Sequence, residues 1–501
     1  MNLVKINQSN LSTASEELWR VLFPKIQYLE WKDQRLVELA FTQMVLAHGN
    51  DKRKSGDFYI VHPACACLTL ASIGMDKNTL AACLLHDVPE DTAVSLKDLS
   101  CEFNSEIIYL VEGVARLSAV KYQGEERFAE NLRRMFVAMS RDLRIIFIKL
   151  AERLHNLQTL KYVDPSKQHR IALESLEIYA SIADRLGITM LKNEIEDTAF
   201  PFVYPDIHKS FISVSELEIN RRQKIGERLI KKVKKSLEEN HIKYIEVYGR
   251  AKKYYSLYKK ITEKEKNLAE IFDLVAMRVI TRDVENCYRI LSHLQQIFDP
   301  IPEGFKDYID RPKPNGYQSL HLRLMDNETG SPFEFQIRTP QMHQQAEYGV
   351  AAHYIYKADQ QSTTLLNTKN LVWISELVDI GQKKLTAEQY LNRVKLDLFT
   401  DRIFVMTPGN DAIDLPAGSS ALDFAYRIHE VIGHHATMAK VNHQIAKLGD
   451  KLNNGDVVEI ITDKRQCPKA DWLKLVTTSH ATKHIRSFLK KQTTNDDLTK
   501  K

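Results

Sequence analysis

The sequence predicts a multidomain α and α+β protein, with an all-helical N-terminal domain, a mixed α/β domain and a small β-rich domain. Three observations predict this order. Between residues 26 and 196 apolar side chains recur every three or four positions, which is the helical period. Residues 333–338 alternate strictly between apolar and polar, as a strand with one buried face does. With 501 residues, the chain has room for roughly two to four domains, each with its own core.

The predicted boundaries follow these patterns along the chain. They are an N-terminal segment (1–25), a helical domain (26–196), a helical connector (197–243), an α/β domain (244–357), a second helical connector (358–398), a β-rich domain (399–463) and a basic tail (464–501).

The composition is that of an ordinary soluble protein, with 44% apolar and 27% charged residues. The chain contains no apolar run of about 18 residues and no signal peptide pattern at its start, so we expect a cytoplasmic protein without a membrane partner. The net charge of +5 is too small to predict nucleic-acid binding over the whole surface. The six cysteines include no CxxC pair, which argues against a disulfide framework or a zinc ribbon.

The helical domain contains a dense group of metal-ligand side chains in the run Leu-Leu-His-Asp-Val-Pro-Glu-Asp-Thr. His86 and Asp87 are neighbours on a helix, so both can lean toward one ion. Pro89 lacks an N–H and would end or kink that helix, so Glu90 and Asp91 would reach the same pocket from a bend. Alternatively, the carboxylates form a solvated helix end and His86 is a hydrogen-bonded core histidine. The run alone leaves both interpretations open.

Two further segments of this domain add ligands. His62 precedes a proline and is expected at a helix start, where its ring can face a cavity. Glu152, Asn156 and Thr159 are spaced by four and three, so they share one helix face. Two imidazoles and two carboxylates without sulfur suit Mn²⁺ or Mg²⁺ better than structural zinc. The predicted metal ligands are His62, His86, Asp87 and Glu152.

The α/β domain begins with a basic segment that suits a nucleotide. Lys252, Ser256 and Lys260 fall at successive i+4 positions, so two amines and a hydroxyl form a stripe that can hold a polyphosphate. Arg250 precedes the stripe and can stack on a base. The alternative interpretation is a solvated basic helix.

The strands of the α/β domain supply carboxylates. Asp273 lies near the start of the predicted strand 272–280, where a buried acid needs a partner such as Mg²⁺ or arginine. Glu334 lies on the polar face of the alternating strand, which would line a cleft. The segments 304–308 and 313–321 add turn residues, amines and an exposable aromatic ring. Carboxylates for a metal, cations for phosphates and tyrosines for bases are the equipment of nucleotidyl or phosphoryl transfer.

These motifs resemble known families. The spread of a histidine, a His-Asp pair and a distant acid resembles the HD phosphohydrolase superfamily, in which metal-activated water attacks a phosphorus centre. Over roughly residues 26–463 the chain resembles the RelA/SpoT homologues, which make and destroy the alarmone (p)ppGpp. The resemblance rests on the motifs KPNGYQSLH, FEFQIRT and AEYGVAAH. It implies an all-α HD hydrolase domain, a nucleotidyltransferase-like synthetase domain and a β-grasp TGS domain.

For the hydrolase, the resemblance implies that the four predicted ligands hold Mn²⁺. Glu90 and Asp91 would assist the water that removes the 3′ pyrophosphate. The implied substrate contacts are Arg53 and Ser55 at the alarmone, and Asn156 and Thr159 at its nucleoside. One position departs from the family, which has Asp in a LADRLHN string where this chain has Glu152. The longer arm predicts an altered metal preference or weakened hydrolysis.

For the synthetase, the resemblance implies transfer of pyrophosphate from ATP to the 3′ hydroxyl of GTP or GDP. Asp273 and Glu334 would serve Mg²⁺, and Glu334 would be the base for that hydroxyl. The implied contacts are Arg250 at adenine, Lys252, Ser256 and Lys260 at the ATP phosphates, Tyr317 at guanine, Asn315 and His321 near the acceptor, and Lys306 and Lys313 as further substrate contacts. Lys306 and its neighbour Asp307 fit the bifunctional members. Gly304 stands where those members usually have Arg, which predicts weaker acceptor binding or selectivity.

The β-rich segments 415–429 and 454–460 resemble the TGS domain, which in long homologues contacts the end of deacylated tRNA. His429 would make that contact, and packing inside the small domain is an equal alternative for its ring. Long homologues continue into domains that dock on the ribosome. The sequence ends at Lys501 without them, so we do not expect synthesis to be triggered by ribosome docking.

The sequence thus supports one leading function and two alternatives. The leading one is a bifunctional enzyme with Mg²⁺-dependent synthesis and Mn²⁺-dependent hydrolysis. The second is an enzyme with one activity, in which Glu152 makes the hydrolase the weaker half. The third is a TGS-based RNA-binding regulator with vestigial pockets. A generic HD nucleotidase would leave Asp273 and Glu334 without a role.

Overall fold

The computed structural model describes residues 10–118, 124–264, 271, 274–312, 316–352, 372–382, 385–391, 394, 402–409, 412–453 and 455–499. The chain divides into two compact units, and each is described by itself. The first unit combines residues 1–119 with 142–366, and the second combines residues 120–141 with 367–501. The predicted helical and α/β domains therefore belong mainly to the first unit. No described helix is both long and apolar enough to cross a lipid bilayer.

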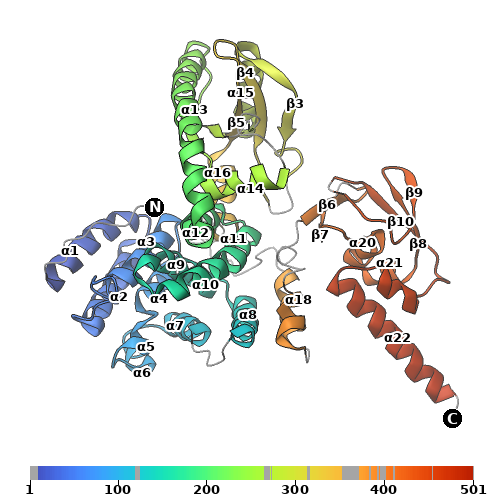
Figure 1. Ribbon diagram of the computed structural model, residues 1–501, viewed down its shortest axis with the longest axis horizontal. Coiled ribbons are helices and arrows are strands. Elements are labelled where there is room, and N and C mark those ends of the chain that lie inside the picture. The colour runs from blue at the N-terminus through green and yellow to red at the C-terminus, as the bar shows by residue number, and fades with distance from the viewer. Residues whose placement is uncertain are drawn as a thin grey trace. The chain divides into compact units, whose positions relative to one another are not determined.

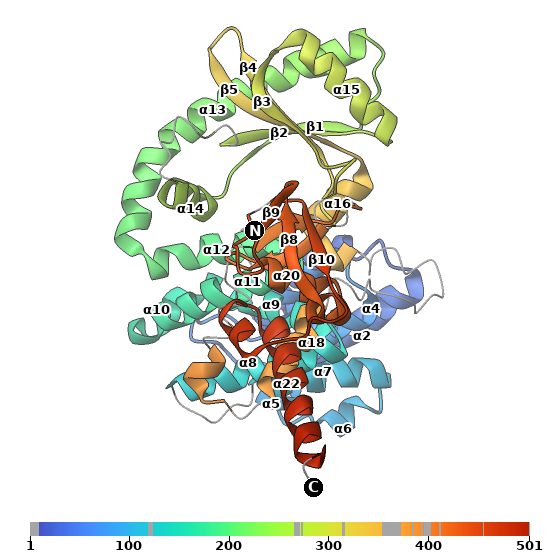
Figure 2. The ribbon, with the colours of Figure 1, turned by 90° about the vertical axis from the view of Figure 1, so that its right-hand side faces the viewer.

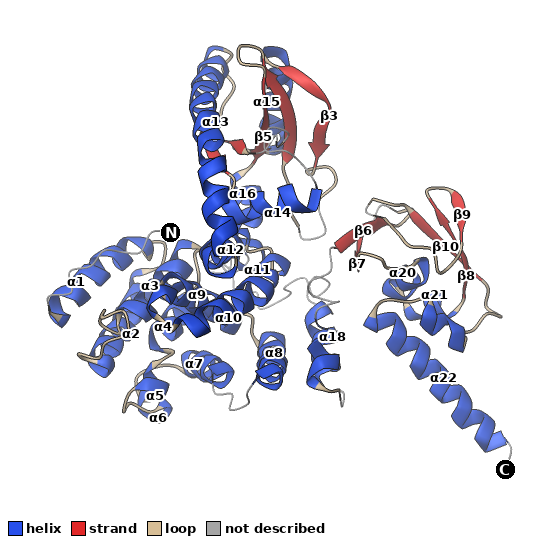
Figure 3. Ribbon diagram, in the orientation of Figure 1, coloured by secondary structure: helices blue, strands red, loops and turns tan. Residues whose placement is uncertain are grey.

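Helices form the regular structure of the N-terminal part of the first unit, as the sequence predicts (Figures 1 and 3). They are α1 (Leu11–Leu22), α2 (Trp31–His48), α3 (Val61–Ser72), α4 (Lys77–Leu85), α5 (Val88–Asp91), α6 (Leu96–Leu99), α7 (Ser105–Ser118), α9 (Arg144–Gln158), α10 (Pro165–Glu174), α11 (Ala180–Arg185), α12 (Thr189–Val203) and α13 (Pro205–Glu239). Almost every residue of α3 is buried, so this helix lies inside the bundle and brings His62 with it.

The break predicted at Pro89 is confirmed. Asp76 begins α4, because its carboxylate accepts hydrogen bonds from the backbone N–H groups of the second and third residues that follow it. The helix ends at Leu85, and the short α5 begins at Val88 with Pro89 as its second residue, where a missing N–H costs nothing. His86 and Asp87 therefore lie in the corner between two helices.

The α/β part of the first unit is a five-stranded sheet in the order β1-β2-β5-β4-β3. Strands β2 and β5 are parallel, and the other neighbours are antiparallel. The elements are β1 (Glu246–Ala251), α14 (Tyr254–Lys264), β2 (Val275–Ile280), α15 (Val284–Ile297), β3 (Asp299–Asp307), β4 (Leu320–Asp326), β5 (Ser331–Arg338) and α16 (Pro340–Tyr348).

One face of this sheet forms the hydrophobic core. Phe333, Phe335 and Ile337 of β5 point into a cluster with apolar residues of α15 and of the C-terminal part of α13, which lie on the same side of the strands (Figure 2). The alternation predicted for β5 is thereby confirmed. Its polar side chains Glu334 and Gln336 occupy the opposite face.

The helical part and the sheet are joined by close contacts within the first unit. Gly349, at the end of α16, has φ +53° and lies against the turn after α11, where the Val350 N–H donates to the Leu186 carbonyl at 2.9 Å. A Cβ on Gly349 would lie 2.3 Å from that carbonyl oxygen, so only glycine fits. Phe200 of α12 packs against Tyr255 and Tyr258 of α14, with ring centroids 5.2 Å apart in both pairs.

The second unit contains the predicted β-rich domain and a helix pair. Helix α8 (Gly124–Arg141) packs against α18 (Val372–Gly381), although the sequence analysis places residues 124–141 in the helical domain. The remaining elements are β6 (Arg402–Met406), β7 (Ala412–Pro416), α20 (Ala421–Ile428), α21 (Glu430–His434), β8 (Ala436–Val441), β9 (Gln444–Ala446), β10 (Val458–Thr462) and α22 (Ser479–Thr499). Trp472 and Ile485 share a buried cluster with Tyr426, so part of the segment 464–501 belongs to the small domain.

Candidate active sites

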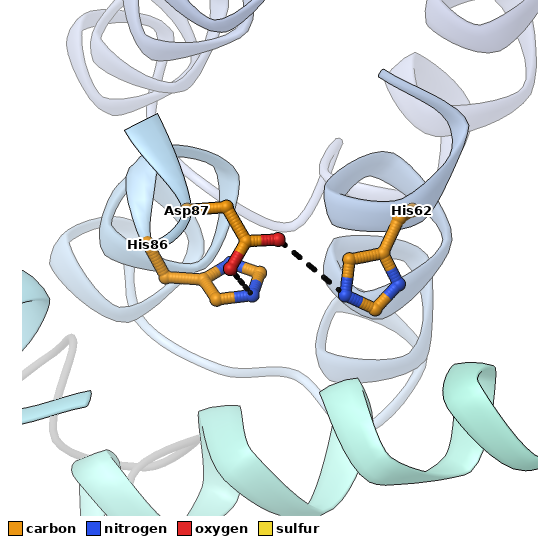
Figure 4. A group of neighbouring side chains, drawn as sticks. All are labelled: His62, His86 and Asp87. Atoms are coloured by element: carbon orange, nitrogen blue, oxygen red, sulfur yellow. Dashed lines mark ion pairs between the residues drawn. The ribbon is translucent and has the colours of Figure 1, made fainter. Parts of the chain in front are cut away.

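Three of the predicted metal ligands meet in the helical part. His62 is the second residue of α3, His86 directly follows α4, and Asp87 precedes α5. Ligand atoms of the three side chains all lie within 4.8 Å of one another. The Asp87 carboxylate reaches both rings, with Oδ1 3.1 Å from His86 Nε2 and Oδ2 3.6 Å from His62 Nε2 (Figure 4).

The chemistry of these three side chains fits a divalent cation. His86 Nδ1 lies 2.7 Å from the Cys83 carbonyl and donates to it, which leaves the lone pair on Nε2. That buried nitrogen has no hydrogen-bond partner among the described residues. Burial and the charge of Arg53 lower the pKa of His62 well below its usual value, and burial raises the pKa of Asp87. Two imidazoles beside a buried carboxylate form a set of ligands that suits such a cation.

Glu152, the fourth predicted ligand, lies outside this group. Its Oε2 atom is 2.7 Å from Nζ of the buried Lys149, and its Oε1 atom accepts a hydrogen bond from Asn156 at 3.2 Å. Burial would raise the pKa of Glu152, but the attraction of Lys149 outweighs it and lowers the pKa. The carboxylate is therefore ionised and already paired. The spacing of three residues on α9 is a signal for this pair that the sequence analysis missed.

The two acidic residues of α5 differ in their surroundings. Asp91 accepts a hydrogen bond from the hydroxyl of Tyr59, whose oxygen also lies 3.4 Å from Asp87 Oδ2. Glu90 is exposed, and partial desolvation together with the charge of Asp87 raises its pKa. A raised pKa makes the Glu90 carboxylate a stronger base, which suits it to general acid–base work.

Two of the four predicted substrate contacts of the helical part, Arg53 and Asn156, lie beside the same group. Arg53 Nη2 donates to Asn156 Oδ1 at 2.8 Å, so these two residues meet. The Ser55 hydroxyl is buried without a hydrogen-bond partner among the described residues, whereas Thr159 directs its hydroxyl to the backbone of its own helix. His155 also contacts Arg53, and the sequence analysis missed it.

In the α/β part, Glu334 is the centre of a polar cluster on the sheet. The side chain is 6% exposed. His321 Nδ1 lies 3.1 Å from Glu334 Oε1, Gln336 donates to the same oxygen at 3.2 Å, and Arg323 Nε lies 3.5 Å from Oε2. Strand pairing places these residues, because β5 lies beside β4 with Glu334 opposite Arg323.

Tyr317 and His321 lie beside Glu334. The Tyr317 hydroxyl lies 2.7 Å from His321 Nε2 and accepts from Arg338 Nη2 at 3.1 Å. Arginine only donates and a carboxylate only accepts, so the bonds run from Arg338 through Tyr317 and His321 to Glu334. His321 Nδ1 thus donates to the Glu334 carboxylate. Arg338 is buried, and the sequence analysis missed its place in this cluster.

Arg250 makes a contact that the sequence did not predict. Its Nη1 atom donates to both oxygens of Glu347, at 2.9 and 2.7 Å, and Arg278 Nη2 lies 2.8 Å from the same carboxylate. Burial opposes ionisation of Glu347, but the two arginines lower its pKa. The only signal in the sequence is the motif AEYGVAAH, which contains Glu347. The carboxylate fixes two guanidinium groups side by side.

Of the other predicted synthetase residues, the structure describes Lys252, Ser256, Lys260 and Lys306. Lys252 precedes α14, and the Ser256 hydroxyl lies 3.5 Å from Asn193 of α12, so the predicted stripe extends beyond the helix. Lys260 lies on α14, and Lys306 of β3 pairs with His321 of β4. Asp273, Lys313 and Asn315 lie outside the described residues.

Gly304 lies in a tight part of β3. A Cβ at this position would lie 2.7 Å from Arg323 Cβ and 2.8 Å from the Ile301 carbonyl oxygen. The Arg expected at this position in bifunctional relatives would therefore require a shift of the backbone or of Arg323.

His429 lies between α20 and α21 in the second unit and is exposed. Its Nδ1 atom accepts a hydrogen bond from the Val431 N–H at 3.2 Å, which caps α21. The ring therefore caps a helix and does not fill the core of the small domain.

Comparison with known proteins identifies three regions. An HD domain model matches residues 39–189, the region found in RelA / SpoT proteins matches residues 249–361, and a TGS domain model matches residues 403–462. A structure of small alarmone synthetase 1 from Bacillus subtilis bound to pppGpp shares 22% identity and covers 31% of this chain and 88% of that one. Its TM-score of 0.23 is too low to support an argument about the fold.

Several curated relatives are similar over most of the chain. A guanosine-3′,5′-bis(diphosphate) 3′-pyrophosphohydrolase of Aquifex aeolicus is 40% identical over 96% of this chain and 67% of its own length. The bifunctional (p)ppGpp synthase/hydrolase SpoT of Escherichia coli is 40% identical over 90% of this chain and 64% of its own. A probable pyrophosphohydrolase of the same type from Synechocystis is 41% identical over 90% of this chain and 60% of its own. The chain thus spans about two thirds of these relatives and belongs to the RelA/SpoT family.

Proposed function

We propose that the protein both makes and degrades (p)ppGpp, with one site in the helical part and another on the sheet. The observation that carries the proposal is the presence, in one chain, of the His62, His86 and Asp87 group and of the Glu334 cluster. The activities for which the relatives are named agree with both halves.

In hydrolysis, water attacks the phosphorus bonded to the 3′ oxygen of the alarmone, and the bond from that phosphorus to the 3′ oxygen breaks. GDP or GTP leaves with the 3′ oxygen, and pyrophosphate, which contains the attacking oxygen, is the other product. His62, His86 and Asp87 would hold a divalent cation, for which we propose Mn²⁺, and the cation supplies Lewis acidity toward the phosphate. Glu90, with its raised pKa, takes the proton of the attacking water. Arg53 and Asn156 lie beside the group and bind the nucleotide.

In synthesis, the 3′ hydroxyl of GTP or GDP attacks the β-phosphorus of ATP, and AMP leaves. Glu334 accepts the proton of that hydroxyl, while His321, Gln336 and Arg323 hold its carboxylate in place. Arg250 stacks on adenine. Glu334 and Asp273 would hold Mg²⁺, which would supply positive charge to the ATP phosphates. RNA binding through His429 remains a prediction from the sequence.

The experiment that tests this proposal uses the purified full chain. ATP with GTP and Mg²⁺ is supplied in one reaction and ppGpp with Mn²⁺ in another, and anion exchange separates the products. We expect turnover in both directions. Turnover in neither would refute the proposal.

A second candidate is a synthetase with weak hydrolysis, and the pairing of Glu152 with Lys149 favours it. A carboxylate held by a buried ammonium is less available to a metal. We expect Glu152→Asp to hydrolyse ppGpp about tenfold faster at low Mn²⁺, because the shorter arm reaches Lys149 less well. The measurement is the hydrolysis rate over a Mn²⁺ titration. An unchanged rate at every concentration would show that Glu152 does not limit the site.

The Glu347 carboxylate leads to a separate prediction for synthesis. Glu347→Gln removes the charge that holds Arg250 and Arg278 together, so we expect the KM for ATP to rise about tenfold while kcat stays within about twofold. Steady-state synthesis assays measure both constants. The control is Glu328→Gln, an exposed carboxylate that also pairs with an arginine. A fall in kcat without a change in KM would contradict this role.

A further inference from the structure

The buried His155 of α9 lies between a predicted substrate contact and a predicted metal ligand. It is 3% exposed. Its Nδ1 atom lies 3.2 Å from Arg53 Nη1 and 2.8 Å from His62 Nδ1. The same ring nitrogen thus faces both neighbours.

The directions of these hydrogen bonds follow from the donors available. A guanidinium has no acceptor, so Arg53 donates and His155 Nδ1 carries no proton. The contact with His62 then requires that His62 Nδ1 is the donor. The lone pair of His62 is consequently on Nε2, the atom that faces Asp87 at 3.6 Å.

The other metal-binding histidine is oriented by a comparable bond. His86 Nδ1 donates to the Cys83 carbonyl at 2.7 Å. A backbone carbonyl can only accept, so this bond always fixes the proton on His86 Nδ1. His62 instead donates to a side chain, which can carry a proton on either nitrogen. The orientation of His62 therefore depends on which nitrogen of His155 carries the proton. The hydrogen bond from Arg53 to His155 Nδ1 decides this.

We infer that His155 is a positioning residue that selects the metal-binding tautomer of His62, and that Arg53 holds His155 in the accepting form. This inference rests on the proposed metal site. It also links two events, because Arg53 is the proposed alarmone contact. Any change in the Arg53 bond on substrate binding alters metal affinity, and the metal alters substrate affinity by the same factor.

Mn²⁺ binding without nucleotide tests the inference on two variants of the full chain. His155→Leu removes the acceptor, and we expect Mn²⁺ to bind about tenfold more weakly. His155→Asn places an amide oxygen near the position of Nδ1, and we expect affinity within about threefold of the wild type. Electron paramagnetic resonance of free Mn²⁺ measures both. Synthesis from ATP and GTP, performed by the other site, reports whether each variant folds.

The outcomes separate the inference from the proposed function. Wild-type affinity in His155→Leu, or equal weakening in both variants, would overturn the role of His155 while the metal site stands. Failure of the wild type to bind Mn²⁺ would overturn both. If His155→Leu loses synthesis as well, Arg53→Met is the variant to test. It removes the hydrogen-bond donor to His155 and leaves the three metal ligands unchanged. Weakening of Mn²⁺ binding by about threefold or more in Arg53→Met supports the inference, and unchanged binding overturns it.

Discussion

Asp87→Asn is expected to slow ppGpp hydrolysis by more than about 100-fold and to leave (p)ppGpp synthesis within about twofold of the wild type. Asp87 is the carboxylate that reaches both imidazoles, at 3.1 and 3.6 Å. Loss of a residue that only orients a metal ligand costs roughly 10- to 100-fold, so loss of the anionic ligand itself should cost more. The amide keeps the shape of the side chain and removes its charge.

The measurement is hydrolysis under saturating Mn²⁺, with synthesis assayed on the same preparation. Glu112→Gln, which alters an exposed carboxylate of α7, is the matched control. Hydrolysis at the wild-type rate in Asp87→Asn would remove the metal centre from the proposed function. Parallel loss of synthesis would instead indicate misfolding of the first unit.

Glu334→Gln is expected to impair synthesis and spare hydrolysis, the reverse of Asp87→Asn. Synthesis should fall by about 100- to 10,000-fold, the range that a general base contributes, while hydrolysis is retained. Gln can still accept from His321 and Gln336 through its amide oxygen, so the packing of the cluster is kept. The loss would therefore report the basicity of the carboxylate and its charge toward Mg²⁺.

Initial rates of AMP formation measure the effect of Glu334→Gln. Gln336→Glu is unsuitable as a control because it lies in the same cluster, so Glu285→Gln, a change at the exposed start of α15, is preferred. Synthesis above about a tenth of the wild-type rate would exclude Glu334 as the base. Loss of synthesis in this variant and of hydrolysis in Asp87→Asn would establish two separate sites.

The sequence predicts those features that depend on local geometry. The alternation of β5 places Glu334 opposite the apolar side chains, and the structure confirms it, because a period of two admits one buried face. The break before Pro89 is confirmed for a similar local reason, since proline cannot donate to the carbonyl four residues earlier and its ring crowds that carbonyl, which favours the end of α4 there. The meeting of His62 with the His-Asp pair follows from the family motif more than from periodicity.

The contacts that the sequence did not predict join residues far apart in the chain. Glu347 meets Arg250 across 97 residues, and His155 meets His62 across 93. No helical or strand period connects such positions, because tertiary packing brings them together. The pair of Lys149 and Glu152 is different. The spacing of three residues between them is visible in the sequence. The Glu152 carboxylate could either bind a metal or pair with Lys149, and only the folded geometry distinguishes these two roles.

The apolar contact between α13 and the sheet limits which part of this chain recombination can exchange. Leu229, Val233 and Leu237 of α13 lie in the core beneath the strands, although the synthetase motifs begin only after that helix. A recombination event that exchanged residues 249–361 alone would place a foreign sheet on a helix selected for another. A functional exchange would therefore have to include the C-terminal part of α13 as well as the sheet. The matched region, 249–361, is shorter than this structural unit.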